Sequence, residues 1–99
     1  MEWTRNYEEF KEWLENMYES NEIRLSKKVK PIVFGEILRR YEDILYARSK
    51  ASTDNEWSAE ADARCREMSA YLLALSDVGK ITKYVYNVIY GTIYSSYHC

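Results

Sequence analysis

Apolar side chains recur every three or four residues through most of the chain, a spacing that places them on one face of an α-helix. In the first segment, glutamates repeat with the same period on roughly the opposite face. This pattern predicts an amphipathic helix over residues 4–20, with Thr4 as its N-cap and Ser20 and Asn21 at its end. The apolar stripe consists of Trp3, Tyr7, Phe10, Leu14 and Met17.

Two further helices follow from the same spacing. Because Pro31 lacks a backbone N–H and restricts the residue before it, we expect a helix to begin near Pro31 and to continue to residue 49. Thr53 and Glu56 have the spacing of a capping box, so a third helix begins there, and Gly79 suits its left-handed C-terminal cap. The second stripe is Val33, Phe34, Ile37, Leu38, Tyr41, Ile44 and Leu45, and the third is Trp57, Ala61, Cys65, Met68, Leu72 and Leu75.

The segment 80–97 fits two structures. Its Ile, Val, Thr and Tyr residues favour strands, and a hairpin that turns near Asn87 or Gly91 is one interpretation. We favour a helix, because three preceding helices need a fourth to complete a bundle. The sequence therefore predicts an all-α domain over 1–99, a bundle of about four helices, with the C-terminal hairpin as the alternative. In the helical interpretation Ile81, Val85, Val88 and Thr92 share the buried face, Ile93 lies beside the tyrosines, and Tyr86, Tyr90, Tyr94 and Tyr97 form another face.

Composition and charge agree with one small globular domain. The chain is 46% hydrophobic and 30% charged, with three Gly and one Pro, which excludes a disordered chain and most turn-rich β folds. The net charge of −2 arises from acidic blocks that alternate with basic ones, an arrangement that favours packing between elements and argues against a general nucleic-acid binder. No apolar run approaches the roughly 18 residues that span a bilayer, and the first residues lack a signal-peptide core. We expect a cytoplasmic protein with no membrane partner.

The residue types that catalysis and metal binding require are sparse. The single histidine, His98, is the second-last residue, and no Cys or His pair has the spacing of a zinc site. Phosphate-binding loops, dinucleotide fingerprints and nucleophile elbows are missing. We therefore expect no enzyme, no catalytic residue, no metal and no cofactor. Cys65, on an apolar stripe, is expected to be a small buried side chain.

Three features are candidates for partner binding. Ten tyrosines and three tryptophans exceed what so small a core requires, and Tyr gives a large, rigid contact area with a hydroxyl, although burial of both faces of the last helix is the alternative. The glutamate row fits a basic groove or is simply solvated. The basic connector fits phosphate, a partner's acidic patch or the glutamate row itself. The residues are Tyr86, Tyr90, Tyr94 and Tyr97; Glu8, Glu12, Glu15, Glu19 and Glu22; and Arg24, Lys27, Lys28 and Lys30.

These features predict a small protein-binding module, an inhibitor or adaptor that occupies the site of a larger protein with a basic groove. Self-association through the tyrosine face is the other mode of protein binding. Phage and mobile-element inhibitors of host defence often share this general profile, which is an analogy and not a family resemblance. The alternative function is a DNA-associated regulator that touches the duplex with the basic connector or the third helix.

Overall fold

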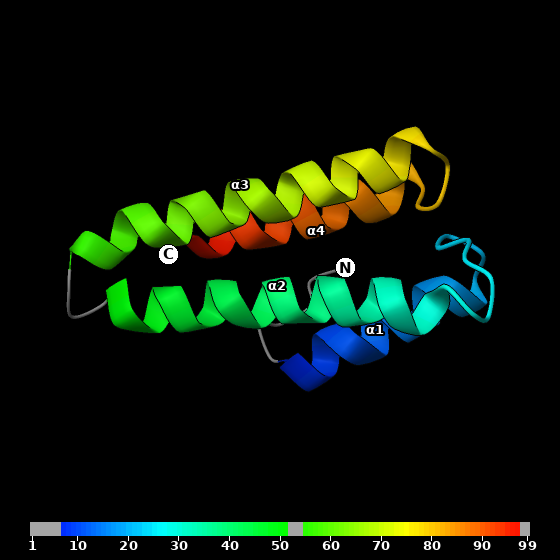
Figure 1. The fold of residues 1–99 in the computed structure, drawn as a ribbon, viewed down its shortest axis with the longest axis horizontal. Helices are drawn as coiled ribbons and strands as arrows, with labels where there is room; N and C mark the ends of the chain where they lie inside the picture. The colour runs from blue at the N-terminus through cyan, green and yellow to red at the C-terminus, as the bar shows by residue number, and fades with distance from the viewer. Residues whose placement is uncertain (1–6, 52–54, 98–99) are drawn as a thin grey trace.

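Four α-helices form an up-and-down bundle (Figure 1). The computed structural model describes residues 7–51 and 55–97, with side chains as far as Tyr94. The all-α prediction is confirmed, and the last segment is a helix and not a hairpin. The predicted caps Thr4 and Thr53 lie outside the described residues, as does His98. The helices are α1 (Tyr7–Glu19), α2 (Lys30–Ala51), α3 (Glu56–Asp77) and α4 (Lys83–Tyr97).

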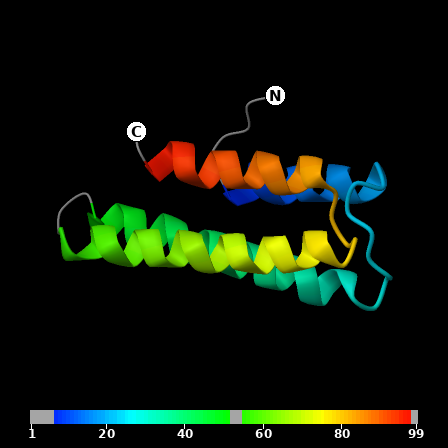
Figure 2. The ribbon, with the colours of Figure 1, turned by 90° about the horizontal axis from the view of Figure 1, so that it is seen from above.

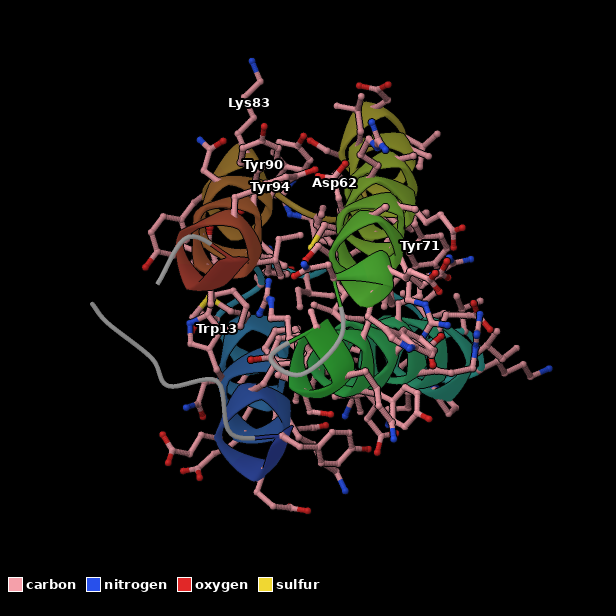
Figure 3. All side chains as sticks on the ribbon, turned by 90° about the vertical axis from the view of Figure 1, so that its left-hand side faces the viewer. Trp13, Asp62, Tyr71, Lys83, Tyr90 and Tyr94 are labelled. Atoms are coloured by element: carbon pink, nitrogen blue, oxygen red, sulfur yellow. The ribbon has the colours of Figure 1, made fainter. Side chains whose placement is uncertain are left out.

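The helices pair into two layers. Figure 2 shows α1 and α4 in one layer and α2 and α3 in the other, and Figure 3, viewed along the bundle, shows the four helices at its corners. The helices α2 and α3 have 22 residues each and form the long antiparallel pair. Because α1 has only 13 residues, it covers only part of the length of α2 (Figure 1).

The predicted apolar stripes supply the core. Nine residues of the first three predicted stripes are fully buried. The ring centroids of two of them, Phe10 and Tyr41, lie 4.2 Å apart where α1 meets α2. The stripes omit Trp13, which is only 4% exposed and lies between α1 and α4 in Figure 3. The fully buried members of the predicted stripes are Phe10, Leu14, Ile37, Tyr41, Ile44, Ala61, Cys65, Met68 and Leu72.

The buried face of α4 is rotated relative to the prediction. Ile89 and Ile93 are fully buried together with Val85, whereas Val88 and Thr92 are only partly buried. The predicted face was therefore wrong by about 50°, half of the 100° step between helical residues. The physical reason is that α4 packs more closely against α3 than against α1, so the residues turned toward α3 are the most buried.

Two loops close the same end of the bundle (Figure 1). Residues 20–29 connect α1 to α2, and residues 78–82 connect α3 to α4. Asn21 (φ 64°) and Gly79 (φ 77°) adopt the left-handed conformation that ends a helix. The predicted ends of the first and third helices are thus confirmed.

The two loops are hydrogen-bonded to each other. The Arg24 N–H donates to the carbonyl of Lys80 (2.7 Å), and the Thr82 N–H donates to the carbonyl of Glu22 (3.0 Å). The Thr82 hydroxyl also donates to the Glu22 carboxylate (3.1 Å) and accepts from the N–H of Val85 (3.4 Å), which makes Thr82 the N-cap of α4. These bonds bring the basic residues of both loops to one end of the bundle.

Burial of Cys65 makes the fold sensitive to alkaline pH. Burial raises the pKa of the Cys65 thiol, and the nearby Arg48 charge opposes this shift only in part. The unfolded thiol ionises near pH 8.5, so the stabilising contribution is complete below that pH and is lost as pH rises. We expect the free energy of unfolding in urea to decline from pH 8 to pH 10, by at most about 1.4 kcal/mol per pH unit for this group. Cys65→Ala should flatten the decline, and an unchanged slope would contradict the assignment.

Candidate protein-interaction surfaces

Three tyrosines at four-residue spacing form a continuous stripe along α4. The ring centroids of Tyr86 and Tyr90 lie 5.8 Å apart, and those of Tyr90 and Tyr94 lie 4.6 Å apart. Tyr90 keeps 43% of its surface exposed, whereas Tyr86 and Tyr94 are partly buried against the core. We refer to these three residues as the tyrosine stripe. The side chain of Tyr97, the fourth predicted member, lies outside the described part of the structure.

The tyrosine stripe lies over the seam between α4 and α3. Figure 3 shows Tyr90 and Tyr94 on the same side of the bundle as Asp62 of α3. Burial raises the pKa of Tyr86, and the charges of Tyr90 and Tyr94 and then of Asp77 add to this rise. Because residues 78–82 join the end of α3 to the start of α4, Tyr86, in the first turn of α4, lies near the end of α3. One edge of the stripe packs on the core while its other edge faces outward, so the face is partly buried.

The outer face of α4 has no charged residue after Lys83. From residue 84 to residue 97 the sequence contains no acidic or basic side chain, whereas each of the other three helices carries both signs. Tyr84 is 49% exposed, and Asn87 and Gly91 are exposed as well. A surface that is depleted of charge and rich in Tyr has the composition of the buried centre of a protein–protein interface.

The carboxylates of the glutamate row of α1 differ in how far they are buried. Glu8, Glu12 and Glu19 are exposed. Glu15 is half-buried and lies 2.7 Å from the ammonium of Lys30, so part of the row is complemented within the fold. This is one of the two interpretations that the basic connector allowed.

Lys30 is held by its surroundings and is a structural cation. Besides its ion pair with Glu15, its Nζ lies 4.4 Å from the centroid of the Tyr18 ring and 5.2 Å from that of Phe34. Cation–π contacts of this kind stabilise a partly buried ammonium. Of the three predicted partner-binding lysines, Lys30 is therefore the one that the fold itself uses.

The structure adds basic residues to the remaining part of the connector. Lys27 and Lys28 are exposed, as are Lys80 of the neighbouring connection and Lys83, the first residue of α4. The hydrogen bond between the backbones of Arg24 and Lys80 places the two segments side by side. We call these five residues the basic end. The sequence could not reveal it, because the contact joins positions more than fifty residues apart.

Two neighbouring glutamates of α1 should respond differently to neutralisation. Glu12→Gln should leave stability unchanged or raise it slightly, because like-charge repulsion along the helix is relieved. Glu15→Gln removes the ion pair with Lys30, and should lower the free energy of unfolding by up to about 1 kcal/mol, a loss that salt reduces. Urea unfolding at low and high salt measures both. Equal responses of the two variants would contradict a stabilising pair.

Comparisons with known proteins leave the function to be argued from these surfaces. The chain matches no protein-family model, no curated protein and no solved structure. In the described part of the chain, no cluster of three or more His, Cys, Asp or Glu side chains is arranged to hold a metal ion. Within the same residues, no helix combines the length and the apolar character that crossing a bilayer requires.

Proposed function

We propose that this protein is a non-catalytic protein-binding module, an inhibitor or adaptor that acts in the cytoplasm by occupying the site of a larger protein. The observation that carries the proposal is the tyrosine stripe on the charge-free outer face of α4. In a chain that is 30% charged, a helix with no charge over 14 consecutive residues supports this proposal, because depletion of charge is typical of the centre of a protein–protein interface.

The tyrosine stripe is suited to enter a groove as a pre-ordered ridge. Its rings already contact one another, so binding immobilises few additional rotamers and less entropy is lost. Tyr90 has a tyrosine on either side and is the most exposed of the three, which is the central position that interface hot spots occupy. An amphipathic helix laid into an apolar groove is a common mode of recognition.

The exposed carboxylates of α1 supply a separate surface. Figure 3 shows α1 on the side of the bundle opposite to Tyr90 and Tyr94. Glu8, Glu12 and Glu19 would therefore approach a basic groove without competing for the tyrosine surface, and their charge would accelerate association. Two independent surfaces on one small domain are typical of an adaptor. Phage and mobile-element inhibitors remain a profile analogy.

The proposal is tested by capture with matched variants. Immobilised wild-type protein should retain a partner from the native host, and Tyr90→Ala should weaken its affinity at least fivefold. Tyr46→Ala is the control, since Tyr46 is 51% exposed on α2 and its ring also contacts an aromatic neighbour, Trp57, at 5.7 Å. A partner retained equally by all three proteins would contradict the assignment of the tyrosine stripe.

Association with duplex DNA is the second candidate, and the basic end favours it. Five basic side chains, four from two loops and one from the first residue of α4, gather there, where the sequence alone offered a single connector. Binding to duplex DNA that weakens steeply as salt rises, and that Lys27→Gln with Lys28→Gln reduces, would support this candidate. The lack of binding at about 50 mM salt would remove it.

A further inference from the structure

Lys83 and Asp62 lie at opposite ends of the tyrosine stripe, and Asp77, whose charge acts on Tyr86, lies near the Lys83 end. Lys83, the first residue of α4, is exposed at one end. Figure 3 shows it on the same side of the bundle as Tyr90, Tyr94 and Asp62, the last of which belongs to α3. The stripe itself is uncharged. The charges that a partner of the tyrosine stripe would meet therefore come from residues at the ends of the stripe, such as Lys83 and Asp62.

Asp62 lies level with the far end of α4. One nitrogen of Arg48, Nη2, contacts both the carbonyl of Ile93 and the Sγ of Cys65, the latter at 3.6 Å, so Cys65 and Ile93 lie at the same height in the bundle. Since α3 and α4 are antiparallel, Asp62, about one turn before Cys65, lies beside the last turn of α4. Lys83 and Asp62 of one chain are thus roughly 20 Å apart.

We propose that a second copy of this chain occupies the tyrosine stripe when no larger protein does, with the two α4 helices antiparallel about a twofold axis at Tyr90. This inference rests on the proposed function, which assigns the stripe as a binding surface. Tyr90 is the midpoint of a segment from Lys83 to the last turn of α4. An antiparallel pair sets the Lys83 of each copy against the Asp62 end of the other, whereas a parallel pair would set Lys83 against Lys83.

The surface is complementary to itself. A twofold interface places one patch against the same patch, so a patch of net charge repels its own copy. The tyrosine stripe has no charge between its ends, and each hydroxyl both donates and accepts hydrogen bonds. Within one chain, Oδ2 of Asp62 already lies 2.9 Å from Nη2 of Arg66. A carboxylate has enough lone pairs to accept from Arg66 and from the Lys83 of a second copy as well. Lys83 of the second copy would join that pair without displacing it.

The pairing is weak, and it competes with target binding. A single helix of 15 residues offers a face about 22 Å long, which buries less than the roughly 1,600 Å² of a standard interface. We therefore expect a dissociation constant of tens to hundreds of micromolar, on the order of weak transient contacts. Because both partners cover the same tyrosines, capture of the larger protein requires the pair to separate.

Sedimentation of the full chain from about 10 µM to 1 mM is the first test, over the range that this weak affinity requires. The wild type should dimerise with rising concentration, Tyr46→Ala should behave like it, and Tyr90→Ala should weaken dimerisation at least fivefold. Lys83→Glu should weaken it about threefold to tenfold, and adding Asp62→Lys should restore it. A wild type that stays monomeric at 1 mM overturns the proposal. If adding Asp62→Lys to Lys83→Glu does not restore dimerisation, the antiparallel arrangement is overturned.

Zero-length cross-linking is the second test. A carbodiimide joins the amine of Lys83 to the carboxylate of Asp62 only when they are in contact, which the roughly 20 Å within one chain forbids. In an equal mixture of unlabelled and ¹⁵N-labelled protein, about half of the cross-linked peptides should therefore combine one labelled and one unlabelled chain, as random pairing of copies requires. Their absence at 1 mM overturns the proposal. A monomer that still captures a target through Tyr90 would overturn self-association and leave the proposed function intact. A dimer that captures no target would support self-association and contradict the proposed function.

Discussion

Replacing Phe10 by alanine is expected to lower the free energy of unfolding by about 3–5 kcal/mol, the range for buried aromatic-to-alanine changes. The side chain of Phe10 is fully buried, and its ring contacts that of Tyr41 at a centroid distance of 4.2 Å. Only Trp13 and Leu14 are buried with it between Tyr7 and Glu19, so Phe10 is one of three buried side chains that anchor this short helix on the bundle. Since small domains are stable by about 5–15 kcal/mol, the loss is a large share of the total.

Lys11→Ala is the matched control for this change. Lys11 is the next residue on the same helix and is exposed, so its truncation should alter stability by less than about 0.5 kcal/mol. Urea titrations followed by circular dichroism measure both variants. If Phe10→Ala lowers the free energy of unfolding by less than about 1 kcal/mol, the prediction is contradicted. Trp13 and Leu14 would then suffice to hold α1 in place.

The sequence predicts the core best where charged residues mark the exposed side of a helix. On α1 and α3, acidic and basic residues alternate with the apolar stripe, and Leu14 and Leu72 fall where the helical period puts them. On α4 no charge marks the outer side after Lys83, so spacing alone leaves the rotation of the helix open. The prediction that Val88 rather than Ile89 is buried was wrong because no charged residue after Lys83 identifies the exposed side of α4.

The candidate surfaces were predictable only in part, because two of them depend on contacts between distant segments. Helical spacing alone brings Tyr86, Tyr90 and Tyr94 together, and the structure shows that they form one stripe. The ion pair of Glu15 with Lys30 depends on how α1 meets α2. The basic end likewise depends on hydrogen bonds between two loops. Local periodicity contains no information about such packing.

The position of Trp13 shows a second limit of periodicity. Trp13 lies among glutamates, next to the stripe that Phe10 and Leu14 define, and a narrow stripe therefore excludes it. A helix packed in the corner of a bundle has two neighbours and buries a wider arc than one that lies on a single partner. The indole fills the space between α1 and α4 (Figure 3), and so widens the buried arc of α1.

Two adjacent residues of α4 are expected to have opposite effects when truncated. Ile89 is fully buried, so Ile89→Ala should lower the free energy of unfolding by about 2–5 kcal/mol. Tyr90, at 43% exposure, contacts mainly its neighbouring tyrosines, so Tyr90→Ala should change stability by less than about 1 kcal/mol. The second variant should instead weaken partner binding or self-association by more than about 1 kcal/mol.

The same pair of variants decides how α4 is oriented in the bundle. Urea unfolding gives the stability of each variant, and sedimentation or titration with the captured partner gives its binding. Val88→Ala serves as the reference, because Val88 is only partly buried and its truncation should cost less than that of Ile89. If Val88→Ala proves the more destabilising, α4 buries the face that the sequence predicted. If instead Tyr90→Ala unfolds the protein and spares association, the tyrosine stripe belongs to the core. The binding surface would then have to be sought at the basic end or on α1.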